Sequence, residues 1–343
     1  MSLTADPLLD AATVERFLDA RGLGAGPVAV RRIGEGHSNV TFLVERGGTR
    51  VVLRRPPLPP LPPSAHDVLR EARVQAALGA AGVPVPRILA VCADASLLGV
   101  PFYVSEYVDG AVVTAALPRD LDAPRQRRAL GEALVGALVA IHEVDWLAAG
   151  LDGFGNPEGY LERQVRRFSA LWELNATREL PQVLELAAWL RRNLPEPGPA
   201  TVVHGDYRLG NVLVARAAPA RVLAVLDWEL STIGDPLADV GYLLATYSDA
   251  ASRGTPLELS PVTRGDGFPS RSELAELYER RTGRTVTRLP WYEALALWKA
   301  AVFCEGIYGR HLRGEADGPF QRSLADGVPR LLAAAAEAAS GHG

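Results

Sequence analysis

VVHGDYRLGNVLVARAAPARVLAVLDWELSTIGDPLADVGYLL, residues 202–244, is the stretch that decides the fold. It contains two short apolar β-type runs, residues 201–204 and 222–226, and a polar cluster follows each run. The first cluster contains Asp206, with Asn211 five positions later, and the second begins at Asp227. Carboxylate and amide oxygens at the ends of rigid strands are the ligands that a magnesium-phosphate site needs. The stretch therefore predicts such a site.

Length and composition predict a globular enzyme with two lobes. The chain has 343 residues, of which 48% are hydrophobic and 22% are charged. A net charge of -4 argues against nucleic acid as a partner. Cys92 and Cys304 have no metal-ligand spacing, which fits a reduced, cytoplasmic setting. The first residues do not resemble a signal peptide, and no run approaches the roughly 18 apolar residues of a membrane span.

The first part of the chain predicts a small β-sheet lobe. Apolar spacing predicts a helix over residues 9–21 and a main helix over residues 67–80. Period-two runs predict five strands, at residues 28–33, 40–44, 50–54, 87–91 and 101–107. The turn signal Asp109-Gly110 marks the expected boundary, so residues 1–109 are predicted to form the N-terminal lobe.

Residues 110–343 predict a larger, mainly helical lobe. Proline at position 124 and a capping box at Ser270 and Glu273 mark two of the helix starts. The predicted helices cover residues 125–142, 160–175, 182–193, 237–247, 271–281, 289–312 and 320–339. The fold class expected is therefore α+β, with a small antiparallel sheet lobe and a helical lobe.

Several motifs together resemble one family. HGDYRLGN and LDWELSTIGDPLADVG resemble the catalytic loop and the metal-binding segment of the aminoglycoside phosphotransferase family, within the protein-kinase-like superfamily. LRRPP, SAHDVLREARV and FYVSEYVDG extend the resemblance over nearly the whole chain, with the branch fused to acyl-CoA dehydrogenases as the most similar group. The resemblance implies a bilobal protein-kinase-like fold that transfers phosphate from ATP with Mg²⁺.

The resemblance assigns roles in the catalytic loop. Asp206 takes the position of the catalytic aspartate, which orients the substrate hydroxyl and accepts its proton, and Asn211 and Asp227 take the magnesium-ligand positions. An isolated Asp in a turn is more often a turn former, but the three residues together match what phosphoryl transfer needs. His204 is a catalytic-loop candidate, for which a bracing role is favoured over a catalytic one. Arg208 has two open functional roles, contact with a phosphate or pairing with Asp239, and an exposed surface arginine is the alternative to both.

Residues 34–39 occupy the place of the glycine-rich phosphate loop, with Asn39 in place of the third glycine. By itself this segment fits a simple hairpin turn equally well. Between two predicted strands it is interpreted as a loop that covers the phosphates, with Gly34, Gly36 and the Ser38 hydroxyl as nucleotide contacts.

The rest of the predicted nucleotide site departs from the usual kinase pattern. Arg54 stands where the third strand normally carries a lysine, and its planar guanidinium binds phosphate oxygens in a different geometry. Strand alternation puts Val52, the expected roof over the adenine, on the same face. Glu71 on the predicted helix is the expected ion-pair partner, although a solvated helix charge is the alternative. Backbone groups of Glu106 and Val108 would pair with the adenine edge.

The acceptor is predicted to be a small molecule with a hydroxyl group. Helices of the second lobe supply the candidate contacts, which are Tyr242, Trp291, Trp298, Glu305, Tyr308 and Arg310. This lobe has no obvious acidic run, which disfavours a cationic aminoglycoside, and the resemblance favours a hydroxyacyl-type acceptor. The alternatives are an antibiotic phosphotransferase, a nucleotide-binding regulatory module and a protein kinase. The sequence gives no prediction of the oligomeric state.

Overall fold

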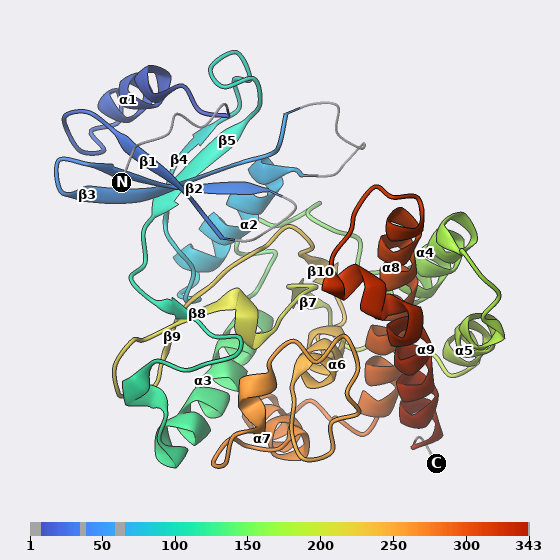
Figure 1. The fold of residues 1–343 in the computed structure, drawn as a ribbon. Coiled ribbons are helices and arrows are strands. Elements are labelled where there is room, and N and C mark those ends of the chain that lie inside the picture. Colours follow the sequence, from blue (N-terminus) through green and yellow to red (C-terminus); the bar gives the residue numbers. More distant parts are fainter. Residues whose placement is uncertain (1–7, 35–38, 59–65, 342–343) are drawn as a thin grey trace. The chain divides into compact units, whose positions relative to one another are not determined.

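The computed structural model describes residues 8–34, 39–58 and 66–341. The chain divides into two compact units (Figure 1), one formed by residues 1–109 with 223–229 and the other by residues 110–222 with 230–343. Residues 223–229 therefore group with the first unit, although they follow residue 109 by more than a hundred positions. The chain contains β-strands, α-helices and short 3₁₀ helices, which confirms the predicted α+β class.

The first unit is built on a five-stranded antiparallel sheet in the order β1-β2-β3-β5-β4. All five predicted strands are present. Gly47 and Gly48 have φ of 49° and 80°, which lets a tight turn join β2 to β3. The strands are β1 (Ala29–Ile33), β2 (Val40–Arg46), β3 (Thr49–Arg55), β4 (Ile88–Cys92) and β5 (Phe102–Glu106).

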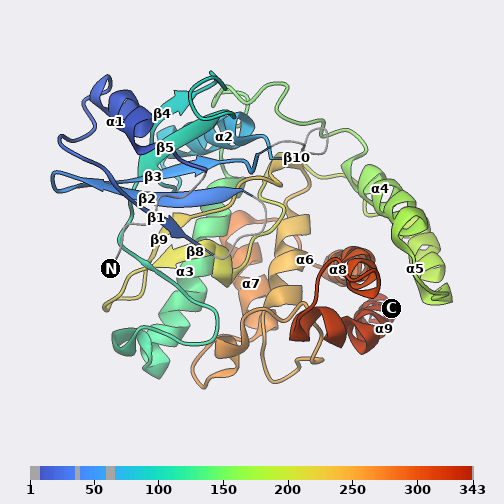
Figure 2. The same ribbon diagram turned by 45° about the horizontal axis from the view of Figure 1, so that its top comes forward.

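A helix covers each face of this sheet (Figure 2). On one face, Phe17 of α1 (Ala11–Asp19) meets Phe102 with ring centroids 4.7 Å apart. On the other face, Ala72 of α2 (Val68–Ala80) packs with Tyr103. Phe102 and Tyr103 point to opposite faces because successive strand residues alternate. The same alternation buries Leu53 in the α1 core and leaves its neighbours on the α2 face.

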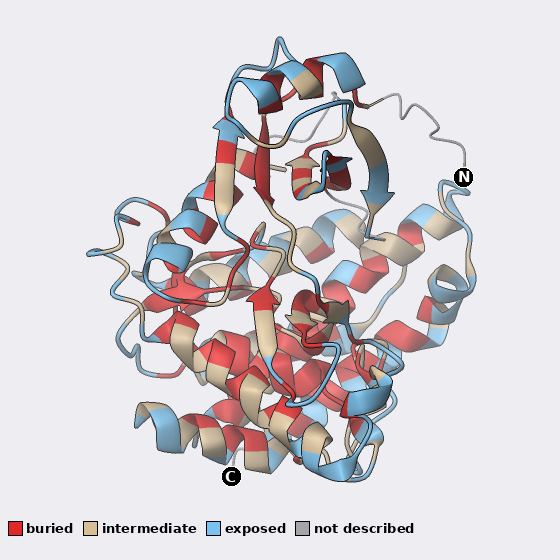
Figure 3. Cartoon of the chain, turned by 90° about the vertical axis from the view of Figure 1, so that its left-hand side faces the viewer, coloured by how far each residue is buried: buried red, intermediate tan, exposed pale blue. Residues whose placement is uncertain are grey.

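In the second unit, α4, α5, α6 and α9 pack around α8, whose Trp291 and Trp298 are fully buried, and α3 packs against α7. The indole nitrogens of both donate to backbone carbonyls of α5, at 3.1 and 3.0 Å. Every helix of the unit except α6 carries both buried and exposed residues, whereas α6 has no exposed residue (Figure 3). The α-helices are α3 (Pro124–His142), α4 (Tyr160–Asn175), α5 (Pro181–Arg192), α6 (Leu237–Thr246), α7 (Arg271–Thr282), α8 (Leu289–Leu312) and α9 (Pro319–Ser340).

Short strands hold the loops of the second unit. β7 (Thr201–Val203) pairs antiparallel with β10 (Thr232–Gly234), and β6 (Ala111–Val112) pairs antiparallel with β8 (Val212–Val214). The sequence predicted β7 and β9 (Val222–Val225) but not the other three strands. These have only two or three residues, too few to establish a period. Among the helices of the described residues, none combines the length and apolar character needed to span a bilayer.

Candidate active site

The loop after β7 carries the predicted catalytic residue. Gly205 has φ of 87°, and a Cβ there would lie 2.7 Å from the carbonyl oxygen of Leu230, so only glycine fits. Asp206 follows, and a short 3₁₀ turn at Leu209–Asn211 brings Asn211 back towards it. The amide nitrogen of Asn211 donates to the backbone carbonyl of Asp206 at 2.9 Å and to its carboxylate at 2.7 Å. The loop thus holds both polar side chains in one place.

Asp239 at the start of α6 braces this loop from below. Its carboxylate accepts the backbone N–H groups of His204 and Gly205 at 2.6 and 2.8 Å, and its Oδ2 lies 3.3 Å from Nε2 of His142. Burial opposes the charge of Asp239, but these hydrogen bonds outweigh burial and lower its pKa. His204 is fully buried, and its Nδ1 accepts the backbone N–H of Asp206 at 3.2 Å. This placement suits bracing.

Two further side chains approach Asp206. Arg208 points its Nε at Oδ1 of Asp206 from 3.5 Å, so the alternative pairing of Arg208 with Asp239 is wrong. The reason is that the Asp239 carboxylate is already used by the loop backbone. Tyr242 is the other one, and burial followed by the charge of Asp206 raises the pKa of Tyr242 well above its usual value. Tyr242 therefore stays protonated.

In the first unit, Arg54 is the centre of a charged cluster. Its Nε lies 2.9 Å from Oε1 of Glu71, and its Nη2 lies 2.8 Å from Oδ1 of Asp227. The Glu71 carboxylate also accepts the Tyr103 hydroxyl at 3.1 Å and the Asn39 amide at 3.3 Å. Asn39, which departs from the usual glycine pattern, therefore has a partner inside the cluster. Arg54 joins a helix carboxylate to the predicted metal ligand.

The cluster is charged and its backbone is strained. Burial works against the charge of Arg54, but the carboxylates of Glu71 and Asp227 outweigh it and raise the Arg54 pKa. Burial raises the pKa of Glu71, and Arg54 opposes this effect. Asp227 has φ of 66°, a left-handed conformation that residues other than glycine rarely adopt. Such strain is concentrated at functional sites.

The remaining predicted nucleotide contacts are placed only in part. Gly34 follows β1, whereas Gly36 and Ser38 lie outside the described residues. Val52 shares the partly exposed face of β3 with Arg54. The N–H of Glu106 donates to the Arg87 carbonyl at 2.9 Å, which leaves only its carbonyl for an adenine edge. Val108 lies in the extended segment after β5.

Each of the two predicted magnesium ligands keeps an oxygen that could serve a metal ion. The Asn211 amide nitrogen is used by Asp206, so the amide oxygen is the available donor. Oδ1 of Asp227 accepts from Arg54, and Oδ2 remains. No group of three or more His, Cys, Asp or Glu in the described parts of the chain is suited to a metal ion. Carboxylate and amide oxygens are donors of the type that magnesium takes, one or two at a time, together with phosphate and water.

Most of the predicted acceptor contacts are structural. Trp291, Trp298 and Glu305 are fully buried. The Glu305 carboxylate accepts the backbone N–H of Thr177 at 3.2 Å and pairs with Arg178 at 3.1 Å, so it fixes the loop after α4. The Tyr308 ring lies under the Arg178 guanidinium, and Arg310 is exposed. Of the six candidates, Tyr242 is the one that contacts Asp206.

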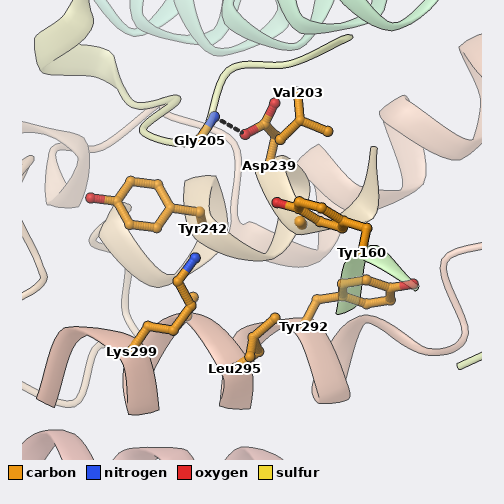
Figure 4. Close-up of a pocket in the computed structure, with 10 residues that line it drawn as sticks. Tyr160, Val203, Gly205, Asp239, Tyr242, Tyr292, Leu295 and Lys299 are labelled. Atoms are coloured by element: carbon orange, nitrogen blue, oxygen red, sulfur yellow. Dashed lines mark hydrogen bonds between the residues drawn. The ribbon is translucent and has the colours of Figure 1, made fainter. Parts of the chain in front are cut away.

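A small cavity beside the catalytic loop was not predicted (Figure 4). Its lining includes Gly205, Tyr242, Tyr160 of α4 and Lys299 of α8. Lys299 is the only lysine of the chain. It lies within a run of apolar helix residues, which predicts a core helix, and its isolation in an otherwise arginine-based chain was the signal available.

Comparisons with known proteins point to one family. Residues 29–280 match the family model described as the phosphotransferase enzyme family, APH. Acyl-CoA dehydrogenase family member 11 of Gallus gallus is 39% identical over 319 residues, and the match covers 90% of this chain but 40% of that protein. Member 10 of Mus musculus is 37% identical over 85% of this chain and 27% of its own length. The chain thus spans less than half the length of these relatives.

Solved structures share the fold. A candidate aminoglycoside phosphotransferase of Ralstonia eutropha has a TM-score of 0.82 and 31% identity, covering 97% of this chain and 98% of that one. A mutant of the aminoglycoside phosphotransferase APH(4)-Ia, in a ternary complex with AMP-PNP and hygromycin B, has a TM-score of 0.60 and 20% identity over 94% and 98% of the two chains. The chain therefore has the protein-kinase-like fold and belongs to the aminoglycoside phosphotransferase family of phosphotransferase enzymes.

Proposed function

We propose that this protein is an ATP- and Mg²⁺-dependent phosphotransferase that moves the γ-phosphate to a hydroxyl of a small molecule. The observation that carries the proposal is the Asp206–Asn211 pair, which a family-matched loop holds through two hydrogen bonds. A carboxylate for the acceptor and an adjacent amide oxygen for the metal are what phosphoryl transfer asks of a protein.

Each residue has a task in this scheme. Asp206 accepts the proton of the acceptor hydroxyl as that oxygen forms its bond to the γ-phosphorus and the bond to the leaving ADP oxygen breaks. Arg208 and Tyr242 lie beside Asp206 and help to orient it. Asn211 and Asp227 would hold Mg²⁺, which neutralises phosphate oxygens when bound. Arg54 would bind phosphate oxygens in place of the usual lysine, held in position by Glu71.

A hydroxyacyl-type compound is the acceptor class that we favour. The relatives in which this segment occurs are named as acyl-CoA dehydrogenase family members, and a kinase segment joined to such an enzyme would act on a related acyl compound. The cation Lys299 beside the catalytic loop also disfavours a cationic antibiotic.

The test is an acceptor screen with ATP and Mg²⁺ that contains hydroxyacyl compounds, aminoglycosides, macrolides and a protein substrate. We expect transfer to a small hydroxyl compound. Asp206→Asn, which keeps the size of the side chain and removes the proton acceptor, should lower turnover by about 10²–10⁴-fold. Asp266→Asn is the matched control, because Asp266 is an exposed aspartate of the same unit.

Other outcomes would replace the proposal. ATP binding without turnover on any acceptor would favour the regulatory module, and transfer to the protein substrate alone would favour a protein kinase. Equal turnover by wild type and Asp206→Asn would remove Asp206 from the mechanism.

A further inference from the structure

The cavity beside the catalytic loop has a volume of about 20 Å³. About one water molecule occupies such a space, so it suits the end group of a ligand and not a whole acceptor. Its lining residues come from α4, α6, α8 and the end of β7, all within the second unit.

Lys299 brings a positive charge to this cavity and forms no ion pair with a carboxylate of the described residues. Its ammonium donates to Oε1 of Gln164 at 2.9 Å and lies 4.7 Å from the centroid of the Phe168 ring. Throughout residues 8–34, 39–58 and 66–341 it has no ion-pair partner. Desolvation followed by the positive charge of Arg167 lowers its pKa to about 8, although Asp239 acts in the opposite direction. An ammonium has three donors, and only one of them has an acceptor here.

A second unanswered donor faces the same space. The Tyr160 side chain extends from the first turn of α4, and its hydroxyl points into the cavity, as does the Lys299 ammonium (Figure 4). Within the described part of the chain this hydroxyl has no hydrogen-bond acceptor. The nearby carboxylate of Asp239 does not supply one, because it accepts two backbone N–H groups and faces His142. Two donors therefore converge on this space, and the one carboxylate among its lining residues, that of Asp239, is already engaged by the loop backbone and His142.

We propose that this cavity binds the carboxylate end of the hydroxyl acceptor, with Lys299 and Tyr160 as its donors. The inference rests on the proposed function, since it concerns the acceptor of the same site. A carboxylate has two acceptor oxygens, and its charge would complete the missing pair for Lys299. The small volume of the cavity, about 20 Å³, favours a carboxylate over the larger phosphate group.

The cavity is also in the right place for an acceptor. Gly205, which lines it, directly precedes Asp206. Tyr242 lines it as well, and the negative charge of the nearby Asp206 raises the pKa of the Tyr242 hydroxyl. A hydroxycarboxylate anchored at Lys299 would therefore present its hydroxyl end in the neighbourhood of Asp206. Lys299 and Tyr160 are specificity-determining residues in this scheme.

The single lysine allows a direct test that needs no turnover. Protein labelled with ¹³Cε-lysine gives one lysine side-chain signal in NMR spectra, and its pH titration reports Lys299 alone. The probes are ω-hydroxycarboxylates of three to six carbons, each compared with the diol of the same length. We expect at least one hydroxycarboxylate to raise the Lys299 pKa by about one pH unit or more, a tenfold linkage, and the diols to leave it unchanged. Equal responses to acid and diol, or none to any acid, would overturn the proposal.

A kinetic test separates the two donors. Lys299→Met should raise the KM for a hydroxycarboxylate that the enzyme uses as acceptor by at least about tenfold, and it should leave the KM for the diol unchanged. Tyr160→Phe should show the same pattern with a smaller rise in KM. Arg166→Met, which removes an exposed cation of α4, is the matched control. A rise for acid and diol alike would contradict a carboxylate site. If no compound is phosphorylated, the proposed function fails, while the NMR titration still decides the carboxylate site.

Discussion

Arg54 of the first unit and Lys299 of the second unit are both cations with little exposure to solvent, but the groups around their charges differ. Arg54 lies within 3 Å of two carboxylates, those of Glu71 and Asp227. Lys299 has a neutral amide and the face of an aromatic ring. The pKa of Arg54 is raised and that of Lys299 is lowered accordingly.

This difference separates a preorganised group from an incomplete one. A cation whose partners are already present holds other groups in position, as Arg54 does for Asp227. A cation that is desolvated without a counter-ion costs stability, and a bound anion would recover that cost. A buried cation is thus held in place by partners within the protein in one unit, and in the other it is left to be paired by a ligand.

The largest effect is expected from removing the paired cation. Arg54→Met leaves the Glu71 carboxylate, with 1% of its side chain exposed, without a counter-ion and facing Asp227. The free energy of unfolding in urea at pH 7 should fall by about 3–5 kcal/mol. Most of this comes from Glu71, because Asp227 is about a third exposed and its pair is screened by water. Arg54→Lys keeps the positive charge but not the planar guanidinium, so its free energy of unfolding should fall by less. A fall below about 1 kcal/mol for Arg54→Met would show that the pairing does not stabilise the first unit.

Removing the unpaired cation, Lys299, should raise the free energy of unfolding instead of lowering it. The pKa of Lys299 is lowered from 10.5 to about 8 in the folded protein. The unfolded chain therefore binds more protons between these pH values, and wild-type stability should rise as pH increases from 8 to 10.5. At pH 7 Lys299 is charged in the folded and the unfolded chain, so the full cost of burying its charge destabilises the wild type. Lys299→Met should therefore raise the free energy of unfolding by on the order of 3 kcal/mol.

The pH profile is the check on this gain. The free energies of unfolding in urea of the wild type and Lys299→Met should differ most at pH 7 and become equal towards pH 10.5. The Arg166→Met control should have the same pH profile as the wild type. The charged groups near Lys299 are Arg167 and Asp239, and both are unchanged in the comparison. A difference that is constant over this range, or a loss in Lys299→Met, would contradict the idea of an unanswered charge.

The smallest effect concerns the link between the cavity and Asp206. Tyr242→Phe removes a hydroxyl near the Asp206 carboxylate and leaves the ring that lines the cavity. A hydroxyl that positions Asp206 should contribute about as much as one hydrogen bond, about 1 kcal/mol, so kcat should fall roughly fivefold with little change in the acceptor KM. An unchanged kcat would show that Tyr242 does not position Asp206, and a large rise in KM would make it a binding residue.

The sequence was informative where a local period or a compact motif determines the structure. Alternation along β3 put Val52 and Arg54 on the face opposite Leu53, and that face meets the helix that carries Glu71. The loop of Asp206 and Asn211 is defined by a spacing of five residues and closed by local hydrogen bonds.

Long-range partners were beyond such patterns. Arg54 and Asp227 are 173 positions apart, so their pairing follows from tertiary packing alone. Asn39 appeared only as a missing glycine, and its contact with Glu71 depends on how α2 meets the sheet. Lys299 lies on a helix with apolar residues on most sides, where the sequence indicates burial but not an adjoining cavity.

Because the chain has one lysine, local unfolding of α8 can be measured by proteolysis. An endoproteinase that cleaves only after lysine has a single target in this chain, the bond after Lys299, in the middle of a helix packed against α4, α6 and α9. Cleavage needs an unwound, accessible strand of backbone, so the native protein should resist it. Any digestion would give two fragments, residues 1–299 and 300–343, and its rate would report how often the centre of the helical unit opens.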